Sequence, residues 1–193
     1  NRIVIAPMCQ YSAEVGSATD WHLMHYGKLA LSGAGLLIVE ATGVEPEGRI
    51  TPGCLGLWSD ANEAALKRVV DAVRKISAVP LAIQLAHAGR KASSHKPWDG
   101  GQLIAPGEGG WLPVAPSALP HAPHEAPPLA LDDAGLARVR QAFEGYARLN
   151  SIDYPGEIAA WRAEHVVPAA GTAGWGLAQS GAGRTVELIV SPE

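Results

Sequence analysis

The chain has 193 residues, of which 47% are hydrophobic and 18% charged, with a formal net charge of −4. These values favour one globular domain and give no electrostatic reason to expect nucleic acid or an anionic membrane as a partner. No apolar run is long enough to span a bilayer, and no secretory leader is visible. Asn at position 1 suggests a processed or partial chain. Cys9 and Cys54 have neither CxxC nor zinc-ligand spacing, which predicts reduced thiols, no metal site and a cytoplasmic location.

Strand and helix patterns alternate from the start of the chain. Residues 2–6 (RIVIA) are rich in β-branched side chains and stop at a proline, which predicts a buried strand. Apolar residues then recur at helical spacing over residues 21–33, where glycines end the run. Residues 36–40 (LLIVE) are continuously apolar up to the final carboxylate. This pattern is typical of a strand buried on both faces of a parallel sheet.

A second helix is predicted next. Asp60 and Glu63 have the spacing of a capping box at its start. An apolar stripe along the helix comprises Leu66, Val69, Val70, Val73 and Ile76. Pro80 ends this pattern, and residues 81–85 (LAIQL) predict the third strand.

A long connection precedes the third predicted helix. Residues 86–128 contain eight of the 15 prolines, and a connection of this length is usually functional. Asp132 is predicted to cap the helix that follows. One face of that helix carries Leu136, Val139, Phe143 and Ala147.

This order predicts an α/β fold with a parallel sheet over residues 1–149, either doubly wound or a (β/α)8 barrel. No GxGxxG follows the first strand, which argues against a dinucleotide-binding Rossmann domain. Residues 150–193 differ, since glycines interrupt every periodicity. Within them, only residues 185–190 are predicted as a strand, and residues 157–165 as a short helix.

Functional sites of such folds form at the carboxyl ends of the strands. That rule selects Pro7, Met8, Cys9, Gln10 and Tyr11 after the first strand, Glu40, Ala41 and Thr42 at the end of the second, and Gln84, His87, Gly89, Arg90 and Lys91 around the third. The histidines of the first predicted helix, His22 and His25, are interpreted as structural.

Each candidate allows two interpretations from the sequence. Cys9 is either an inert buried thiol or a group that tunes a redox cofactor or attacks as a nucleophile. Tyr11 either packs or presents its hydroxyl to a substrate. Gln84 hydrogen-bonds either to the backbone or to a heteroaromatic ring. His87 is either a base or a core or loop histidine, and Glu40 either binds a cation or caps a loop.

Three segments within residues 1–149 resemble the old yellow enzyme family of flavin oxidoreductases, especially its bacterial branch with a cysteine beside the flavin. They occur in the family's order. The segments are NRIVIAPMCQYS (1–12), VEATGVEPEGRITPGCLGLWSD (39–60) and IQLAHAGRKA (83–92).

The resemblance implies a (β/α)8 barrel that holds FMN at the strand carboxyl ends. It also implies reduction of the flavin by NAD(P)H, followed by hydride transfer from flavin N5 to an activated alkene or a related electrophile. The protein positions the cofactor and tunes its electronics. By resemblance, the flavin contacts are Ala6, Pro7, Met8, Cys9, Ala41 and Gln84, with Cys9 tuning the ring and Tyr11 facing the substrate; Cys9 and Tyr11 are the implied catalytic residues.

The rest of the chain departs from the family. After residue 149 we find no paired-histidine motif with its tyrosine, no flavin-facing arginine and no late glycine-rich loop for the FMN phosphate. A complete barrel takes about 250 residues. We therefore predict a partial (β/α)8 barrel, about three βα units, followed by a divergent tail over residues 150–193. An alternative is a truncated, inactive fragment that binds FMN weakly or not at all and pairs with a second copy through its open sheet edge.

Overall fold

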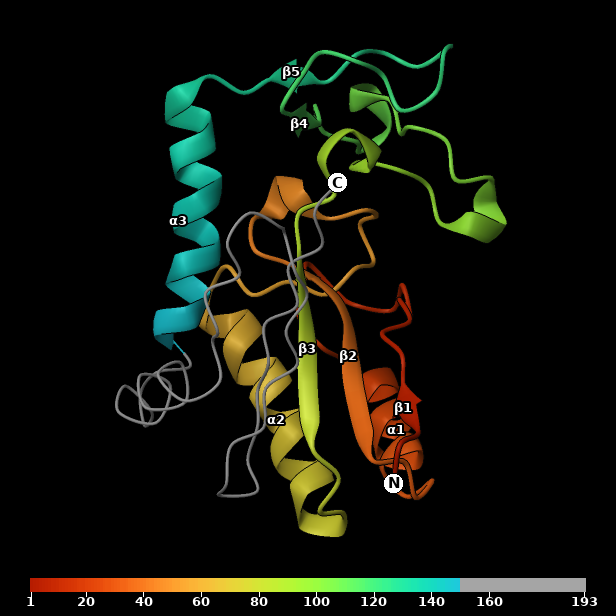
Figure 1. The fold of residues 1–193 in the computed structure, drawn as a ribbon. Coiled ribbons are helices and arrows are strands. Elements are labelled where there is room, and N and C mark those ends of the chain that lie inside the picture. The colour runs from red at the N-terminus through yellow and green to blue at the C-terminus, as the bar shows by residue number, and fades with distance from the viewer. Residues whose placement is uncertain (150–193) are drawn as a thin grey trace.

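The computed structural model describes residues 1–149, with side chains up to residue 145. At its centre is a parallel sheet with the strand order β1-β2-β3 (Figure 1). The helices and strands are β1 (Val4–Ile5), α1 (Asp20–Ala30), β2 (Leu36–Gly43), α2 (Asp60–Ile76), β3 (Leu81–Ala86), β4 (Val114–Ala115), β5 (Leu129–Ala130) and α3 (Asp133–Leu149). The alternating strands and helices and the parallel sheet are confirmed. The strand and helix predicted after residue 149 lie outside the described residues.

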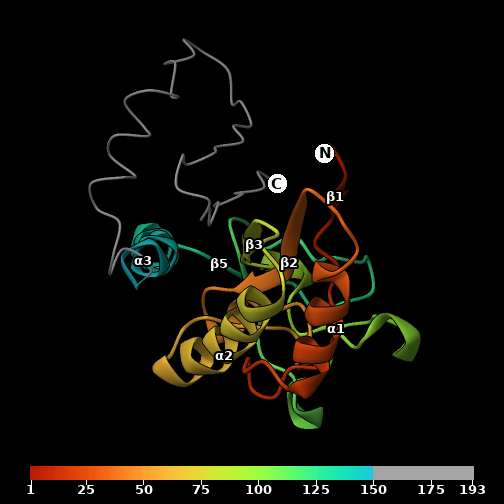
Figure 2. The ribbon, with the colours of Figure 1, turned by 90° about the horizontal axis from the view of Figure 1, so that it is seen from below.

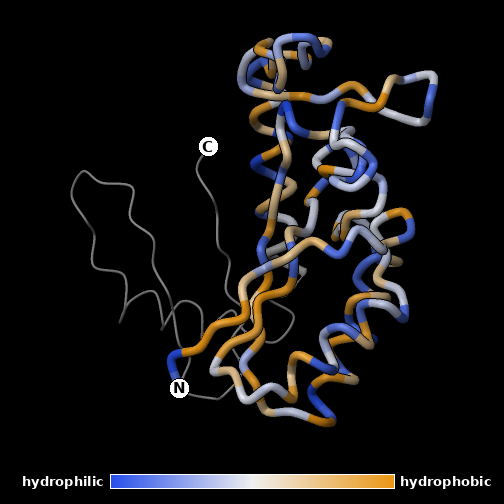
Figure 3. Tube along the Cα trace, turned by 90° about the vertical axis from the view of Figure 1, so that its right-hand side faces the viewer, coloured by the Kyte–Doolittle hydropathy of each residue, from blue (hydrophilic) through white to orange (hydrophobic). Residues whose placement is uncertain are grey.

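Helices α1 and α2 cover one face of the sheet (Figure 2). The strands carry the longest hydrophobic stretches of the trace (Figure 3), because they supply the centre of the core. The side chains buried between this face and the two helices include Leu37, Val39, Ile83 and Leu85 from the sheet, Tyr26 and Ala30 from α1, and Leu66, Val69 and Val73 from α2. Burying this continuous apolar cluster is the main force that holds the βα units together.

The first strand differs from its prediction as a buried strand. Only Val4 and Ile5 pair with β2, opposite Leu36 and Leu37, and Val4 is 50% exposed. The reason is topological, since β1 is an edge of the described sheet and its other side has no neighbour within residues 1–149. The apolar pattern thus predicted the strand correctly, but its predicted burial is wrong.

The start of α2 also corrects a prediction. Its N-cap is Ser59, whose hydroxyl accepts a hydrogen bond from the Asn62 N–H, and not Asp60. Leu66, Val69 and Val73 of the predicted stripe are buried, whereas Ile76 is 54% exposed where the helix ends. For α3, the Asp132 cap is confirmed because its carboxylate accepts from the Gly135 N–H at 2.8 Å.

The loop between β2 and α2 folds around Trp58. Its indole packs so closely on two glycines that an added Cβ would lie 2.4 Å from it at Gly16 and closer still at Gly56. The Arg49 guanidinium lies 5.1 Å from the Trp58 ring and 4.8 Å from the Trp111 ring, an arrangement that favours cation–π attraction. This contact ties the loop to the proline-rich connection.

We expect Gly56→Ala to destabilise the fold by about 1–3 kcal/mol, because the new methyl group displaces the Trp58 ring. Urea unfolding of the full chain measures the change. Gly107→Ala is the matched control, since an added Cβ there meets nothing within 4 Å. Equal stability of the two variants would contradict the expectation.

The connection predicted over residues 86–128 is not structureless. It contains three short 3-10 helices and β4, and β4 pairs in parallel with β5, which follows the connection. These elements gather beyond the carboxyl ends of β2 and β3 (Figure 1). Among the described helices, none has the length and apolar character needed to cross a bilayer.

Candidate functional site

The candidate residues lie where the chain leaves the three strands. The β2–β3 pairing is irregular between Val39 and Thr42, so Ala41 lies within the shift in register. Ala41 is half-buried, and its backbone N–H interacts with the Cys9 thiol. The structure therefore brings the Cys9 and Ala41 positions into direct contact.

Gln84 lies on the neighbouring strand. Ile83 and Leu85 on either side of it belong to the core under the helices, so Gln84 projects from the opposite face of the sheet. Its partly exposed amide lines a cavity of about 280 Å³ together with His87, β4 and the apolar face of α3, including Leu136 and Phe143. Cys9 and Ala41 do not line this cavity.

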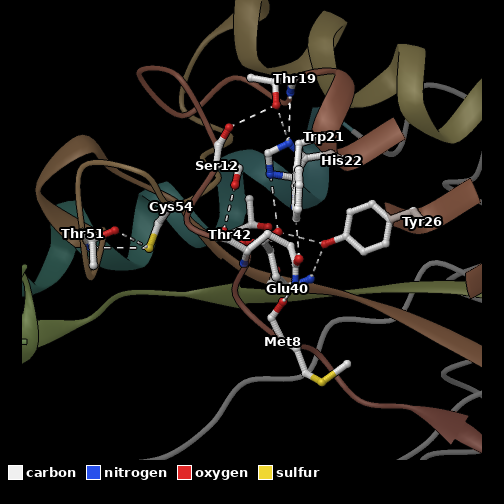
Figure 4. Close-up of polar contacts among 11 residues, drawn as sticks. Met8, Ser12, Thr19, Trp21, His22, Tyr26, Glu40, Thr42, Thr51 and Cys54 are labelled. Atoms are coloured by element: carbon white, nitrogen blue, oxygen red, sulfur yellow. Dashed lines mark hydrogen bonds and ion pairs between the residues drawn. The ribbon is translucent and has the colours of Figure 1, made fainter. Parts of the chain in front are cut away.

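The segment after β1 is held by a buried carboxylate. Glu40 is fully buried, and its Oε2 accepts a hydrogen bond from the Gln10 N–H at 2.8 Å. Its Oε1 accepts from the Tyr26 hydroxyl at 3.0 Å, and that hydroxyl in turn accepts from the Glu40 N–H (Figure 4). Glu40 thus joins β2, α1 and the loop that carries Cys9 and Tyr11. Of the two interpretations offered by the sequence, loop attachment is the one this geometry supports.

His22 completes this buried cluster. Its Nδ1 accepts a hydrogen bond from the Thr19 N–H at 3.0 Å, which leaves the proton of the neutral ring on Nε2, 3.5 Å from Glu40 Oε1. Burial lowers the pKa of His22 to about 4 and raises the pKa of Glu40 to about 7. Near neutral pH the contact therefore joins a neutral imidazole and a half-ionised carboxyl group. This agrees with the structural interpretation of His22.

The segment ahead of Tyr11 is also fixed by its own side chains. The Gln10 amide donates to the Met8 carbonyl at 2.7 Å and accepts from the Trp21 indole N–H at 3.1 Å. Met8 is 51% exposed and Ala6 is exposed as well. The chain thus presents an open, mostly apolar surface next to Cys9.

Tyr11 has a strained backbone with φ of 53°. Such conformations persist where the surrounding structure fixes them, and they are frequent at functional sites. Here the Tyr11 carbonyl packs on Gly53, where an added Cβ would lie 2.5 Å from its oxygen, and the ring meets Trp98 edge-on at 5.4 Å. Burial raises the pKa of the Tyr11 hydroxyl, so this group is a proton donor rather than a phenolate at neutral pH.

The two cysteines are 45 positions apart in the sequence and meet in the fold. The side chains of Cys9 and Cys54 interact with each other, and the Cys54 sulfur accepts a hydrogen bond from the Thr51 N–H at 3.4 Å. These contacts lower the pKa of Cys54, whereas the pKa of Cys9 is raised. The groups around the pair therefore favour the thiolate of Cys54 over that of Cys9.

His87 belongs to a separate polar group beyond β3. Its Nε2 lies 3.8 Å from Glu45 Oε1, and Arg138 of α3 binds the other carboxylate oxygen at 3.0 Å. The Gly89 N–H donates to His87 Nδ1 at 3.1 Å, and burial lowers the pKa of the ring. His87 thus links α3 to the sheet through Glu45, which favours the loop interpretation over that of a base.

Two of these arrangements were not predicted from the sequence. The spacing of Cys9 and Cys54 carries no signal of contact, because the loop that brings Cys54 back is fixed by long-range bonds such as Ala13 N–H to Gly53 O at 2.9 Å. Tyr26 lies within residues 21–33, where the apolar spacing predicts only a helix, although its hydroxyl donates to Glu40. A buried tyrosine needs a partner, and the carboxylate ending the LLIVE run was the available signal.

Parallel βα units with polar residues gathered at the strand ends fit a portion either of a (β/α)8 barrel or of a doubly wound sheet. A family model described as "NADH:flavin oxidoreductase / NADH oxidase family" matches residues 1–127. The chain belongs to this family. The predicted family resemblance and fold class are thereby confirmed.

Individual relatives agree with this family assignment. A NADH:flavin oxidoreductase of Gibberella zeae is 50% identical over 146 residues, covering 74% of this chain and 32% of the relative. A NADPH dehydrogenase of Listeria monocytogenes is 44% identical over 146 residues, covering 75% and 38%. Among solved structures, morphinone reductase has a TM-score of 0.58 at 31% identity, covering 74% and 39% of the two chains. The old yellow enzyme homologue from Zymomonas mobilis has a TM-score of 0.56 at 29% identity, covering 75% and 39%. The chain therefore spans less than half the length of these relatives.

Proposed function

We propose that residues 1–149 form the flavin-facing part of an FMN-dependent oxidoreductase that uses NAD(P)H to reduce activated alkenes or related electrophiles. The observation that carries this proposal is the contact between Cys9 and the Ala41 N–H at the end of β2, with Gln84 on the adjacent strand. These are the positions that the family resemblance assigns to the ring of the flavin. Bound FMN would supply hydride transfer, which no side chain described here can perform.

The residues present fit an isoalloxazine ring. Ala6, Met8 and Cys9 form a partly exposed, mostly apolar edge, and Ala41 adds a small half-buried side chain beside them. Gln84 offers both a donor and an acceptor from a partly exposed amide, which suits the alternating polar atoms of a pyrimidine edge. Pro7 adds no N–H that would need a partner on this edge.

Tyr11 is our candidate for the residue that contacts the substrate. Its raised hydroxyl pKa keeps the phenol protonated, so it can donate a hydrogen bond to a carbonyl oxygen of an enone. Cys9 is the candidate for tuning the ring, since its raised pKa keeps a polarisable neutral thiol beside the cofactor. We also assign the protein to the cytoplasm, where free thiols remain reduced.

Flavin titration of the purified full chain tests this proposal. Because we assign the described residues to the ring of the flavin, we expect riboflavin and FMN to bind with similar affinity, measured by quenching of flavin fluorescence. Gln84→Leu should lower the affinity for both flavins by about tenfold. This is the effect of losing one hydrogen bond worth about 1.4 kcal/mol.

Lys67→Ala is the matched control, because Lys67 lies exposed on α2 and pairs with Asp71. It should leave both affinities unchanged. Failure of both flavins to quench at concentrations of about 1 mM, or equal affinities of wild type and Gln84→Leu, would refute the assigned ring contacts.

A further inference from the structure

We propose that Cys9 and Cys54 form an oxidisable thiol pair, which a hydroperoxide converts into an intramolecular disulfide. The pair is a modification site of this chain and does not depend on the proposed flavin function. It rests on the convergence of the two cysteines of the chain at one point of the fold, next to the end of β2.

Long-range backbone contacts fix this convergence. The Gly53 carbonyl accepts from the Ala13 N–H at 2.9 Å, and the Leu55 carbonyl accepts from the Gly43 N–H at 2.9 Å. Cys54 is therefore held between the segment that follows Cys9 and the last residue of β2. The close approach of Gly53 to the Tyr11 carbonyl brings the loop against the Cys9 segment, which a larger residue at position 53 would prevent.

The side chains of Cys9 and Cys54 then interact directly with each other, and both residues are free thiols. A disulfide forms when the two sulfurs approach to the bond length of about 2.05 Å. Cys54 is 1% exposed and Cys9 is half-buried, so a small oxidant reaches the pair from the Cys9 side, and larger thiol reagents are hindered.

The surrounding groups favour a thiolate on Cys54. The Thr51 N–H donates to its sulfur, and the Thr51 hydroxyl lies 3.4 Å away. Arg49 interacts favourably with the thiolate, while Glu40, which also faces the pair, opposes it. Tyr11, the remaining titratable neighbour, stays protonated, so it adds no charge. The result is a nucleophilic sulfur with a second thiol in contact to resolve the product.

The chemistry balances with one hydroperoxide. The Cys54 thiolate attacks the terminal peroxide oxygen, an S–O bond forms, the O–O bond breaks, and the leaving alkoxide takes up the proton that Cys54 had released. The Cys9 sulfur then attacks the sulfenic sulfur, the S–S bond forms, and water leaves with the Cys9 proton. The two sulfurs lose two electrons, which reduce the peroxide to an alcohol and water; with hydrogen peroxide both products are water.

Mass spectrometry of the full chain treated with hydrogen peroxide at pH 7 tests this proposal. We expect the wild type to lose both alkylatable thiols and about 2 Da while it remains monomeric, with one disulfide-linked peptide pair containing residues 9 and 54. Cys9→Ser should give a sulfenic acid at Cys54 that dimedone traps. Cys54→Ser should react about tenfold more slowly, because Cys9 then has the small thiolate fraction of an ordinary thiol.

Thr51→Val is the matched control for the thiolate. It removes the hydroxyl that lies beside the Cys54 sulfur and also accepts from the Gly53 N–H, but keeps the shape of a buried side chain, so the disulfide should still form, more slowly. Circular dichroism verifies that each variant is folded. The proposal is overturned if the folded wild type retains two alkylatable thiols after treatment, gains about 32 Da per thiol as sulfinic acid, or forms only disulfides between chains.

Discussion

Glu40→Ala should lower the free energy of unfolding by about 3–5 kcal/mol at pH 7. The substitution leaves the Gln10 N–H and the Tyr26 hydroxyl without their acceptor, and each orphaned buried donor costs about 1–3 kcal/mol. The empty space left by the fully buried side chain adds a cavity cost. Urea denaturation of the full chain, followed by circular dichroism, measures the difference.

Glu40→Gln is the matched variant for this prediction. It keeps the volume and one acceptor oxygen, so the Gln10 N–H retains its partner and only the Tyr26 contact is rearranged. We expect it to lose less than half as much stability as Glu40→Ala. If both variants remained within about 1 kcal/mol of the wild type, Glu40 would not hold the segment after β1.

The stability difference between wild type and Glu40→Gln should fall by about 3 kcal/mol as the pH rises from 4 to 8. Burial raises the pKa of Glu40 from 4.5 to about 7, so the folded state binds a proton that the unfolded state has already released. A raised carboxyl pKa contributes stability that is fully present below pH 4.5 and is lost as the pH rises through 7. A shift of about 2.5 units corresponds to about 3 kcal/mol.

Comparison with Glu40→Gln isolates this effect from that of its neighbour. The pKa of His22 is lowered to about 4 by burial, so His22 contributes stability above pH 6.5 that is lost as the pH falls through 4. The burial that lowers the pKa of His22 is retained in Glu40→Gln, so the largest cause of this contribution is common to both proteins. Repeating the measurement in a Cys54→Ser background removes a second titratable group, the cysteine whose pKa is lowered. A difference that is independent of pH would show that Glu40 ionises normally.

The sequence predicted where the strands end better than it predicted the helix cap and the burial of the edge strand. The continuous apolar run that ends in Glu40 identified β2, and the apolar run that contains Gln84 identified β3. Such runs are typical of the buried strands of a parallel sheet. Ser59 was missed as the cap of α2 because the acidic residues that follow it have a similar local pattern. The burial of β1 was also wrong, since exposure depends on neighbours that a local pattern does not contain.

By itself, the sequence determined the order of strands and helices, the α/β class and the family, because apolar periodicity and short motifs are local properties of the chain. Only the tertiary structure decided which polar groups meet. The contact of Cys9 with Cys54 and the convergence of Gln10, Tyr26 and His22 on Glu40 depend on how separate βα units pack. Packing distances between units, and the burial that shifts each pKa, arise from the whole core, so no single segment of the sequence contains them.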